Sequence, residues 1–346
     1  MVASIEDVAR RAGVSIATVS RALRGLPDVA AATRDRVLSA AADLDYVPSP
    51  FAARLASGRT ATVGVVVPFV NRWFFAEVID TVENALRAAG FDLLLYNLGD
   101  EAGRTRFFEV MPMRKRVDAV LIASLMLSDE ELTALDALGT PIGLLGLERP
   151  GFVATRIDDV GAARVAVDHL LDLGHRRIGL IGGDTDDPMR FTPPLHRRTG
   201  YHAALQARGI EPDPALEVLG YFTAEGGLAA AEELLALADR PTALFAESDE
   251  MAYGALRAVR RAGLRVGTDV AVIGFDDQAN AELMDLSTIR QPVSEQALDV
   301  TTRLMAAIGK DGAEHARGSG GTSAATVVLP TELVVRGSTV PARSVD

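Results

Sequence analysis

From residue 62 onward the chain alternates short apolar runs with helical patterns, and this alternation limits the folds open to it. The run TVGVVVP (62–68) is rich in β-branched residues, as expected of a strand buried on both faces of a parallel sheet. A helical pattern (75–90) and a second apolar run (91–97) complete a βαβ unit. Strands that alternate with helices predict a doubly wound α/β sheet.

A second series of alternating segments begins near Ala163 and repeats this arrangement, with strands expected at RRIGLIGG, ALFAES and DVAVIGFDD. Two such halves imply two doubly wound parallel-sheet subdomains with a cleft between them. We expect the N-subdomain over about 61–158 and 291–323, and the C-subdomain over about 159–290 and 324–338.

The N-terminal stretch has a different pattern, that of two short helices joined by a tight turn within residues 4–24. Ser4 followed by Asp7 is a capping-box-like start, and Gly13 tolerates the positive φ needed where the first helix ends. Ser15 restarts the chain as an N-cap. This is the pattern of a helix-turn-helix.

A third helix is expected between residues 26 and 46, packed on the first two through Val37, Ala41 and Leu44. Its start, Ala30, has no side-chain oxygen to accept a first-turn N–H, so Asp28 is an alternative cap. The headpiece is therefore predicted over 1–47, followed by a linker over 48–60 and a core over 61–346.

The second helix of the predicted helix-turn-helix presents Ile16, Ala17, Ser20, Arg21 and Arg24. Its exposed side chains are short near the start of the helix and basic further on. Such a helix can enter the DNA major groove while its arginines reach phosphates or guanine edges. The alternative is an ordinary helical hairpin with a solvated basic face.

The net charge of −12 argues at first against a polyanionic partner, but its distribution matters more. Residues 1–60 hold eight arginines and six acids, a local charge of +2, so the remainder carries −14. A weakly basic head on an acidic body can hold phosphates through locally clustered arginines. The chain has no cysteine and five scattered histidines, so we expect no metal site and no cofactor.

Two other protein classes compete with a DNA-binding regulator. A solute-binding protein would need an N-terminal signal peptide, which the first residues do not resemble. An enzyme would need a motif such as a P-loop, GxSxG or HExxH in context, and Asp184 directly after Gly182-Gly183 would repel a phosphate. No apolar stretch is long enough for a membrane span, so we expect a cytoplasmic protein.

Motifs along most of the chain resemble one known family. VARRAGVSIATVSRAL and the residues up to about Thr60 resemble the DNA-binding headpiece of the LacI/GalR (lactose-repressor) family of bacterial transcription regulators. The likeness returns at LLDLGHRRIGLIGGD, HRRTGYHAAL, ALFAESDEMAYGALRA, VAVIGFDD and STIRQP. The resemblance implies a helix-turn-helix headpiece and a periplasmic-binding-protein-like core, in a repressor switched by a small-molecule effector.

The resemblance also implies roles for individual residues. Within the linker, Ala52 and Leu55 match positions of a hinge helix that enters the minor groove at the operator centre; a plain flexible tether is the alternative. The full predicted set of DNA-contact residues is Ser15, Ile16, Ala17, Thr18, Ser20, Arg21, Arg24, Tyr46, Ala52 and Leu55.

For the effector, the resemblance points to residues that follow the expected strands, where ligands of open α/β sheets bind. The predicted effector-binding set is Phe74, Phe75, Arg197, Phe222, Ser248 and Asp276. Aromatic faces with an arginine and an aspartate suit a sugar or sugar derivative, although a nucleobase would be bound by similar chemistry. Phe75 could instead be pure core, Asp276 a cap and Arg197 a surface residue.

The chain departs from the family pattern at Asp158-Asp159, at Glu148-Arg149 and at Arg24, where many members carry asparagine. The expected partners are pseudo-palindromic double-stranded operator DNA, a second copy of the chain in a homodimer, and a carbohydrate-like effector. No membrane partner is expected.

Overall fold

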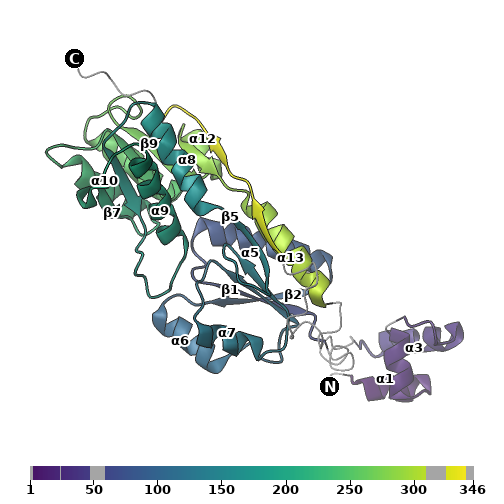
Figure 1. Ribbon diagram of the computed structural model, residues 1–346. Coiled ribbons are helices and arrows are strands. Elements are labelled where there is room, and N and C mark those ends of the chain that lie inside the picture. The colour runs from purple at the N-terminus through teal and green to yellow at the C-terminus, as the bar shows by residue number, and fades with distance from the viewer. Residues whose placement is uncertain (1–2, 24, 47–58, 309–324, 340–346) are drawn as a thin grey trace. The chain divides into compact units, whose positions relative to one another are not determined.

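The computed structural model describes residues 3–23, 25–46, 59–308 and 325–339, and the chain divides into two compact units between Ala61 and Thr62. Within the described ranges, no helix has the length and apolar character needed to cross a membrane. Each unit is described by itself below (Figure 1).

The first unit is a headpiece of three helices, α1 (Ile5–Ala12), α2 (Ile16–Leu23) and α3 (Ala31–Asp43). The capping box at Ser4 is confirmed, because its Oγ accepts from the Asp7 N–H at 3.2 Å and its own N–H donates to the Asp7 carboxylate at 3.0 Å. Gly13 ends α1 with φ of 67°, and Ser15 Oγ accepts from the Thr18 N–H at 3.2 Å. The predicted helix-turn-helix is confirmed.

The headpiece core is small and consists of short apolar side chains, with Val8, Val19 and Val37 fully buried and Ala9 and Ala41 close to them. Valine and alanine let three short helices approach closely. The start of α3 has no side-chain cap at Ala30. The alternative cap was wrong, because the Asp28 carboxylate lies 3.1 Å from the Arg21 guanidinium instead.

The second unit contains two six-stranded sheets, in the orders β11-β5-β4-β3-β1-β2 and β12-β10-β9-β8-β6-β7. Every pair of neighbouring strands is parallel except β10 and β12. The strands are β1 (Thr62–Val67), β2 (Asp92–Asn97), β3 (Ala119–Ala123), β4 (Ile142–Leu145), β5 (Val153–Ile157), β6 (Ile178–Gly182), β7 (Glu217–Leu219), β8 (Ala243–Ala246), β9 (Ala271–Asp276), β10 (Ser287–Arg290), β11 (Thr326–Leu329) and β12 (Glu332–Val334).

In the first half, apolar side chains alternate between the two faces of the sheet. Val63 and Val65 of β1 face the core under α5 (Trp73–Ala88) and α13 (Val293–Ile308), whereas Val66 faces the core under α6 (Glu101–Val110) and α7 (Asp129–Asp136). Helices on both faces bury the strand completely, as the apolar run at 62–68 predicted.

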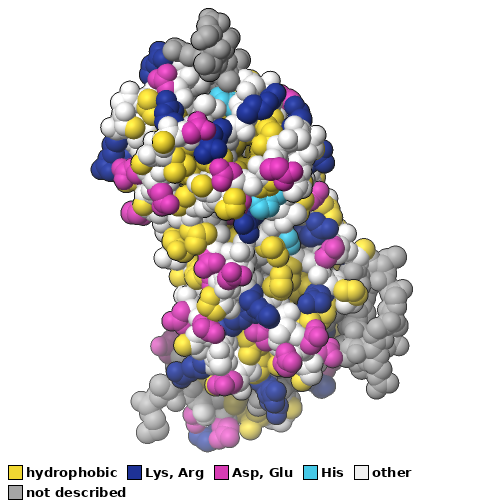
Figure 2. All heavy atoms as spheres, turned by 60° about the vertical axis from the view of Figure 1, so that its left-hand side comes forward, with side chains coloured by type: hydrophobic (Ala, Val, Ile, Leu, Met, Phe, Trp, Pro, Cys, Tyr) yellow, Lys and Arg dark blue, Asp and Glu magenta, His cyan; other side chains and the backbone are white. Residues whose placement is uncertain are grey.

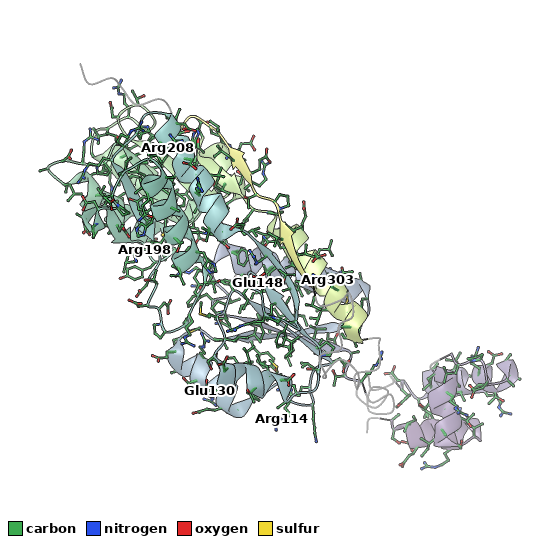
Figure 3. The ribbon with its side chains drawn as sticks, in the orientation of Figure 1. Arg114, Glu130, Glu148, Arg198, Arg208 and Arg303 are labelled. Carbon is green, nitrogen blue, oxygen red and sulfur yellow. The ribbon has the colours of Figure 1, made fainter. Side chains whose placement is uncertain are left out.

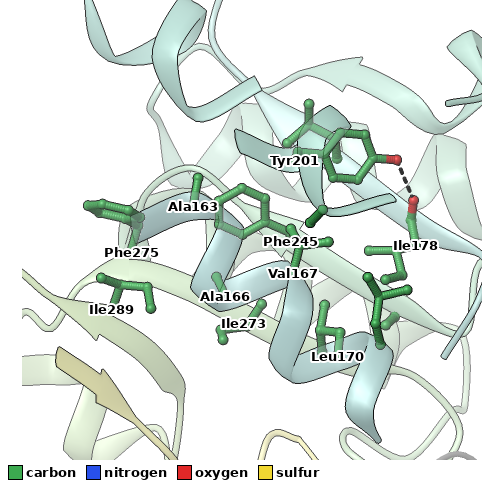
Figure 4. Close-up of a cluster of buried hydrophobic side chains, with 14 of the residues drawn as sticks. Ala163, Ala166, Val167, Leu170, Ile178, Tyr201, Phe245, Ile273, Phe275 and Ile289 are labelled. Atoms are coloured by element: carbon green, nitrogen blue, oxygen red, sulfur yellow. Dashed lines mark hydrogen bonds between the residues drawn. The ribbon is translucent and has the colours of Figure 1, made fainter. Parts of the chain in front are cut away.

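The second half has the same layers. One core lies under α8 (Asp159–Asp172) and α9 (Pro193–Ala207), and the other under α10 (Ala224–Leu235) and α11 (Asp249–Arg261). Figure 4 shows the first of these, where buried Tyr201 donates a 2.7 Å hydrogen bond to the carbonyl oxygen of Ile178. The predicted fold class, two doubly wound subdomains behind a helical headpiece, is confirmed.

The assignment of 324–338 wholly to the C-subdomain was wrong. β11 pairs in parallel with β5 at the edge of the first sheet, and only β12 joins the second sheet, beside β10. Pro330 lies between the two strands and has no N–H with which to continue a ladder. Arg303 on α13 donates to the carbonyls of Ala154 and Ala325, which holds the returning chain against the first sheet (Figure 3).

Several shorter elements were not predicted: α6, α7, α10, β5, β7, a single 3-10 turn (Pro214–Leu216) and α12 (Ala279–Leu283). Acidic and basic side chains are interspersed over both halves on the face of the core that Figure 2 presents.

Candidate effector cavity and DNA-binding helix

A cavity lies inside the second unit, where the carboxyl ends of strands from both sheets meet. Its empty volume is about 960 Å³, a value that includes the open mouth. All six residues predicted to bind an effector contribute to its wall: Phe74, Phe75, Arg197, Phe222, Ser248 and Asp276. Parallel strands place their carboxyl ends at one edge, so residues far apart in sequence converge there. Their role in binding is a proposal, taken up below.

Aromatic rings form one side of the cavity. Phe74 and Phe75 lie at the start of α5 with their centroids 5.2 Å apart, edge to face. Phe191, from the loop before α9, lies 5.9 Å from Phe75 and 5.2 Å from Phe222 of the β7–α10 loop. Phe75 is both core and wall, since it is 1% exposed and still lines the cavity. Such a wall offers flat apolar faces to a ligand.

Arg197 is 4% exposed, so its interpretation as a surface residue was wrong. It lies on α9, and its guanidinium pairs with Asp159 of α8 at 2.9 Å and with Asp276 at 3.7 Å. It also donates to the carbonyl oxygen of Glu247 and lies 3.6 Å above the Phe275 ring. A buried charge needs this degree of compensation. Arg197 therefore holds several segments around the cavity together and is also part of the cavity wall.

Asp276 ends β9 and does not cap the segment after it. Its carboxylate accepts a 2.5 Å hydrogen bond from Gln291 Nε2, and Gln296 in turn donates to Gln291 at 3.4 Å. Burial raises the pKa of Asp276 to about 7, against the lowering effect of Arg197 and of the Gln291 hydrogen bond. The carboxyl is thus a buried hydrogen-bonding group with polar neighbours.

The backbone at this point is strained, since Asp276 has φ of 121° and Asp277 has φ of 56°. Asp249 holds the turn after β9 in this conformation, because its carboxylate accepts from the Gln278 N–H at 2.8 Å and from Thr288 Oγ1 at 2.6 Å. Tyr221 and Phe222 also have positive φ, at 53° each. Strained residues persist where the surroundings fix them and often mark binding sites.

Ser248 is buried at the start of α11 and caps that helix, with its Oγ accepting from the Met251 N–H at 3.3 Å. The hydroxyl hydrogen of a capping serine is still available to donate. The sequence did not indicate this capping role.

Direct contacts across the cavity link the two halves of the core. Arg72, before α5, donates a 2.6 Å hydrogen bond to the carbonyl oxygen of Phe222. The Trp73 N–H donates to the Glu250 carboxylate; burial is the main cause that raises the pKa of Glu250, and this hydrogen bond and Arg72 lower it. Arg72, Trp73 and Glu250 all line the cavity.

A further link is the loop between β6 and α9, residues 184–192, which reaches from the second half to the first (Figure 1). Phe191 forms an antiparallel bridge with Leu125, and the Met126 N–H donates to the Arg190 carbonyl at 3.0 Å. Met189 is 3% exposed within the apolar core of the first half. We call residues 184–192 the strap.

Sequence reasoning missed part of the wall. Besides Arg72 and Glu250, the cavity is lined by Phe69, Asp159, Asp184, Asp187, Phe191, Gln278, Gln291 and Gln296. Asp159 had been noted only as a departure from the family pattern. Its pairing with Arg197, 38 positions away, could have been suspected from the rule that a buried arginine needs an acid.

The predicted DNA-contact residues of the headpiece are mostly exposed or partly exposed. Ser15, Ile16, Ala17 and Arg21 are exposed, and Thr18 and Ser20 are partly exposed. Tyr46 is partly buried against the headpiece core. Arg24, Ala52 and Leu55 lie outside the described residues. Contact with DNA is untested for each of them.

Among the described residues, no group of three or more histidine or acidic side chains has the arrangement of a metal site. Each of the five carboxyl groups at the cavity has an arginine, glutamine or backbone N–H partner.

A helix-turn-helix unit followed by a two-sheet core with a cavity between its halves defines a class, the DNA-binding transcription regulators that carry a ligand-binding domain. Comparison with known proteins agrees. The profile of the bacterial regulatory proteins of the lacI family matches residues 4–49, and that of the periplasmic binding protein-like domain matches residues 167–339.

The HTH-type transcriptional regulator DegA of Bacillus subtilis (strain 168) is 32% identical, over 99% of both chains. A transcriptional regulator CelR–cellobiose complex is 34% identical with a TM-score of 0.70, over 97% of this chain and 99% of that one. The Lac repressor dimer bound to operator and the anti-inducer ONPF is 26% identical with a TM-score of 0.83, over 98% of this chain and 100% of that one. The chain therefore belongs to the lacI family of bacterial transcription regulators.

Proposed function

We propose that this regulator is a repressor whose affinity for operator DNA is switched by a carbohydrate bound in the cavity. The observation that carries the proposal is the cavity itself, which both halves of the core line with aromatic rings and hydrogen-bonding side chains. The CelR structure holds cellobiose and the Lac repressor structure holds operator DNA, which supports the same two ligand classes here.

The chemistry of the wall suits a sugar. The rings of Phe74 and Phe222, both partly exposed, offer apolar faces to the C–H surface of a pyranose. The Asp276 carboxylate accepts hydrogen bonds from hydroxyl groups, and the Gln291 and Gln296 amides can both donate and accept.

A ligand shifts a conformational equilibrium only by its different affinities for the two states. Here the candidate contacts come from both halves, Phe74 and Phe75 from the first and Arg197, Phe222 and Asp276 from the second. A bound sugar would favour one angle between the halves. Coupling of about 1–3 kcal/mol is typical of such a switch, and it must act equally in both directions.

On the DNA side, we propose a homodimer that binds a pseudo-palindromic operator through α2, with Ile16, Ala17 and Arg21 at the major groove. The named relatives are regulators, and we propose that this chain likewise regulates without catalysing a reaction. We also propose a cytoplasmic location, where a bacterial operator would be met.

The experiment that tests the switch is a DNA titration with and without ligand, after a thermal-shift screen of sugars has found a compound that raises Tm. The informative variant is Asp276→Asn, since asparagine keeps an acceptor for Gln291 but loses the carboxylate. Arg197→Ala is less suitable, because an unpaired buried Asp159 would cost about 3–5 kcal/mol.

We expect Asp276→Asn to abolish the ligand response and to leave operator affinity near that of the unchanged protein. Glu282→Gln, an exposed acid on α12, is the matched control and should respond normally. A normal ligand response in Asp276→Asn would show that the effector binds elsewhere.

A further inference from the structure

The geometry points to an uncharged polyhydroxylated compound as the ligand, and to weaker binding of its phosphorylated or carboxylated forms. Asp184 and Asp187 of the strap are the residues that discriminate between the neutral and the charged compounds. This inference rests on the proposed effector-binding function and narrows it. Three separate observations support it.

The first observation is the charge of the wall. Asp159, Asp184, Asp187, Glu250 and Asp276 face two guanidinium groups, those of Arg72 and Arg197. Arg197 is paired with Asp159 and Asp276, whereas Arg72 donates to the neutral Phe222 carbonyl and lies near the Glu250 carboxyl. Among the residues described at the wall, acids outnumber arginines five to two, so an incoming phosphate would meet more carboxyl groups than guanidinium groups.

The second observation concerns the helix N-termini at the cavity, where proteins usually bind phosphate through free backbone N–H groups. α9 begins with Pro193 and Pro194, which have no N–H. The Trp73 N–H in the first turn of α5 donates to the Glu250 carboxylate, and the first turn of α11 is capped by Ser248. At each of these helix starts, one or more N–H groups that could bind an anion are missing or already have an acceptor.

The glycines after β6 are closed in the same way. A Gly-Gly turn at the end of a strand can cradle phosphate through its N–H groups. Here the Gly183 N–H already donates to the buried Glu247 carboxyl at 2.9 Å. A side chain at Gly183 would also collide with Phe222, since an added Cβ would lie 2.3 Å from Cε2 of that ring. This turn therefore packs the wall and offers no anion site.

The third observation is that the strap holds its carboxylates in place. Asp184 accepts from the Asp186 N–H at 2.9 Å, and Asp187 accepts from the Met189 N–H at 2.8 Å. Arg104, buried in the first half, donates to the Met189 carbonyl and pairs with Glu131 at 2.7 Å. Because the strap is anchored at Met189, Asp184 and Asp187 cannot swing away from an incoming anion without breaking these contacts.

The test uses the full chain and matched pairs of compounds: glucose and glucose 6-phosphate, cellobiose and its 6-phosphate, glucose and gluconate, and adenosine and adenosine monophosphate. Binding is measured by thermal shift and then by isothermal titration. For every pair with a neutral binder, we expect the charged member to bind at least about tenfold more weakly, because like charges brought together repel one another.

The double variant Asp184→Asn/Asp187→Asn should narrow that ratio of affinities severalfold, and its melting temperature and operator affinity without ligand show that the variant is folded. Asp186→Asn is the matched control, since this strap residue is exposed and does not line the cavity. It should keep the original ratio.

The outcomes are distinct. A charged member that binds as tightly as its neutral partner would overturn the charge assignment and leave the effector site standing. An unchanged ratio in the double variant would overturn the role of the strap carboxylates. If neither member of any pair binds, the proposed carbohydrate function itself fails.

Discussion

Arg72, in the first half of the core, donates a 2.6 Å hydrogen bond to the carbonyl oxygen of Phe222 in the second half. The same Phe222 has a positive φ of 53° and packs against Phe191 of the strap. One hydrogen bond therefore joins a first-half loop to a strained second-half loop at the cavity wall.

Removing this hydrogen bond should weaken the contact between the two halves of the core at the cavity. For Arg72→Ala we expect ligand affinity to fall about tenfold, because a hydrogen bond from a charged group contributes about 1.5–3 kcal/mol. Isothermal titration with a ligand found in the screen measures the loss. Arg87→Ala, an exposed arginine at the end of α5, should bind normally. Equal affinities for the two variants would exclude a role for Arg72 in closure.

The stability of the core should fall as pH rises from about 5 to 8. Burial raises the pKa of Glu247 to about 8, so the folded chain keeps a proton that the unfolded chain releases above about 4.5. The stabilisation is complete below the unfolded pKa and is lost as pH approaches the folded pKa. Asp276, with its pKa raised to about 7, acts in the same direction.

Chemical denaturation at several pH values tests this expectation. Glu247→Gln stays neutral at every pH and should flatten the decline, by up to about 1.4 kcal/mol for each pH unit. Glu233→Gln, exposed on α10, should keep the original slope. A slope that is equally steep in both variants would locate the pH dependence elsewhere.

In the headpiece, we predict that Asp28 competes with DNA for Arg21. Their side chains are 3.1 Å apart and about half exposed, so the pair adds little stability. We predict that Asp28→Asn raises DNA affinity severalfold at low salt, and that Arg21→Ala lowers the slope of log K against log salt by about 0.9. Asp35→Asn, an exposed acid on α3, is the control for simple charge removal. An affinity gain equal to that of the control would argue against the competition.

The uncapped start of α3 predicts a stabilising substitution. Serine at position 30 can accept a first-turn N–H that Ala30 leaves without a side-chain partner. Ala30→Ser should therefore stabilise the headpiece by about 1 kcal/mol. Hydrogen exchange of headpiece amides in the full chain measures the effect, with the exposed Ala42→Ser as control. Unchanged protection in Ala30→Ser would mean that α3 is limited by another contact.

The parts of the fold that could be predicted depend on local signals. Ser4, Gly13 and Ser15 set the headpiece helices through caps and a left-handed turn, each readable from a few residues. The six effector candidates converge because parallel strands end at one edge, which needs only the order of the strands.

The parts that could not be predicted depend on contacts between distant segments. No local pattern indicates that Met189 leaves its own half to enter the core of the other, or that Arg104 anchors it there. The passage of the chain from the first sheet to the second at Pro330 was missed for the same reason. Pairing with β5 places β11 in the first sheet, and nothing in the sequence of β11 indicates that partner.

Three segments carry the chain between the halves, one after Ile157, one after Arg290 and one at Pro330. They run side by side, because Leu329 pairs with Ile157 on one side and Glu332 with Arg290 on the other. Because the three connecting segments lie flat against one another, we expect them to bend together more easily than they stretch or slide past one another. We therefore expect the two halves of the core to move mainly by bending across these three links. The residues that choose the ligand can change by mutation while the motion they drive stays the same.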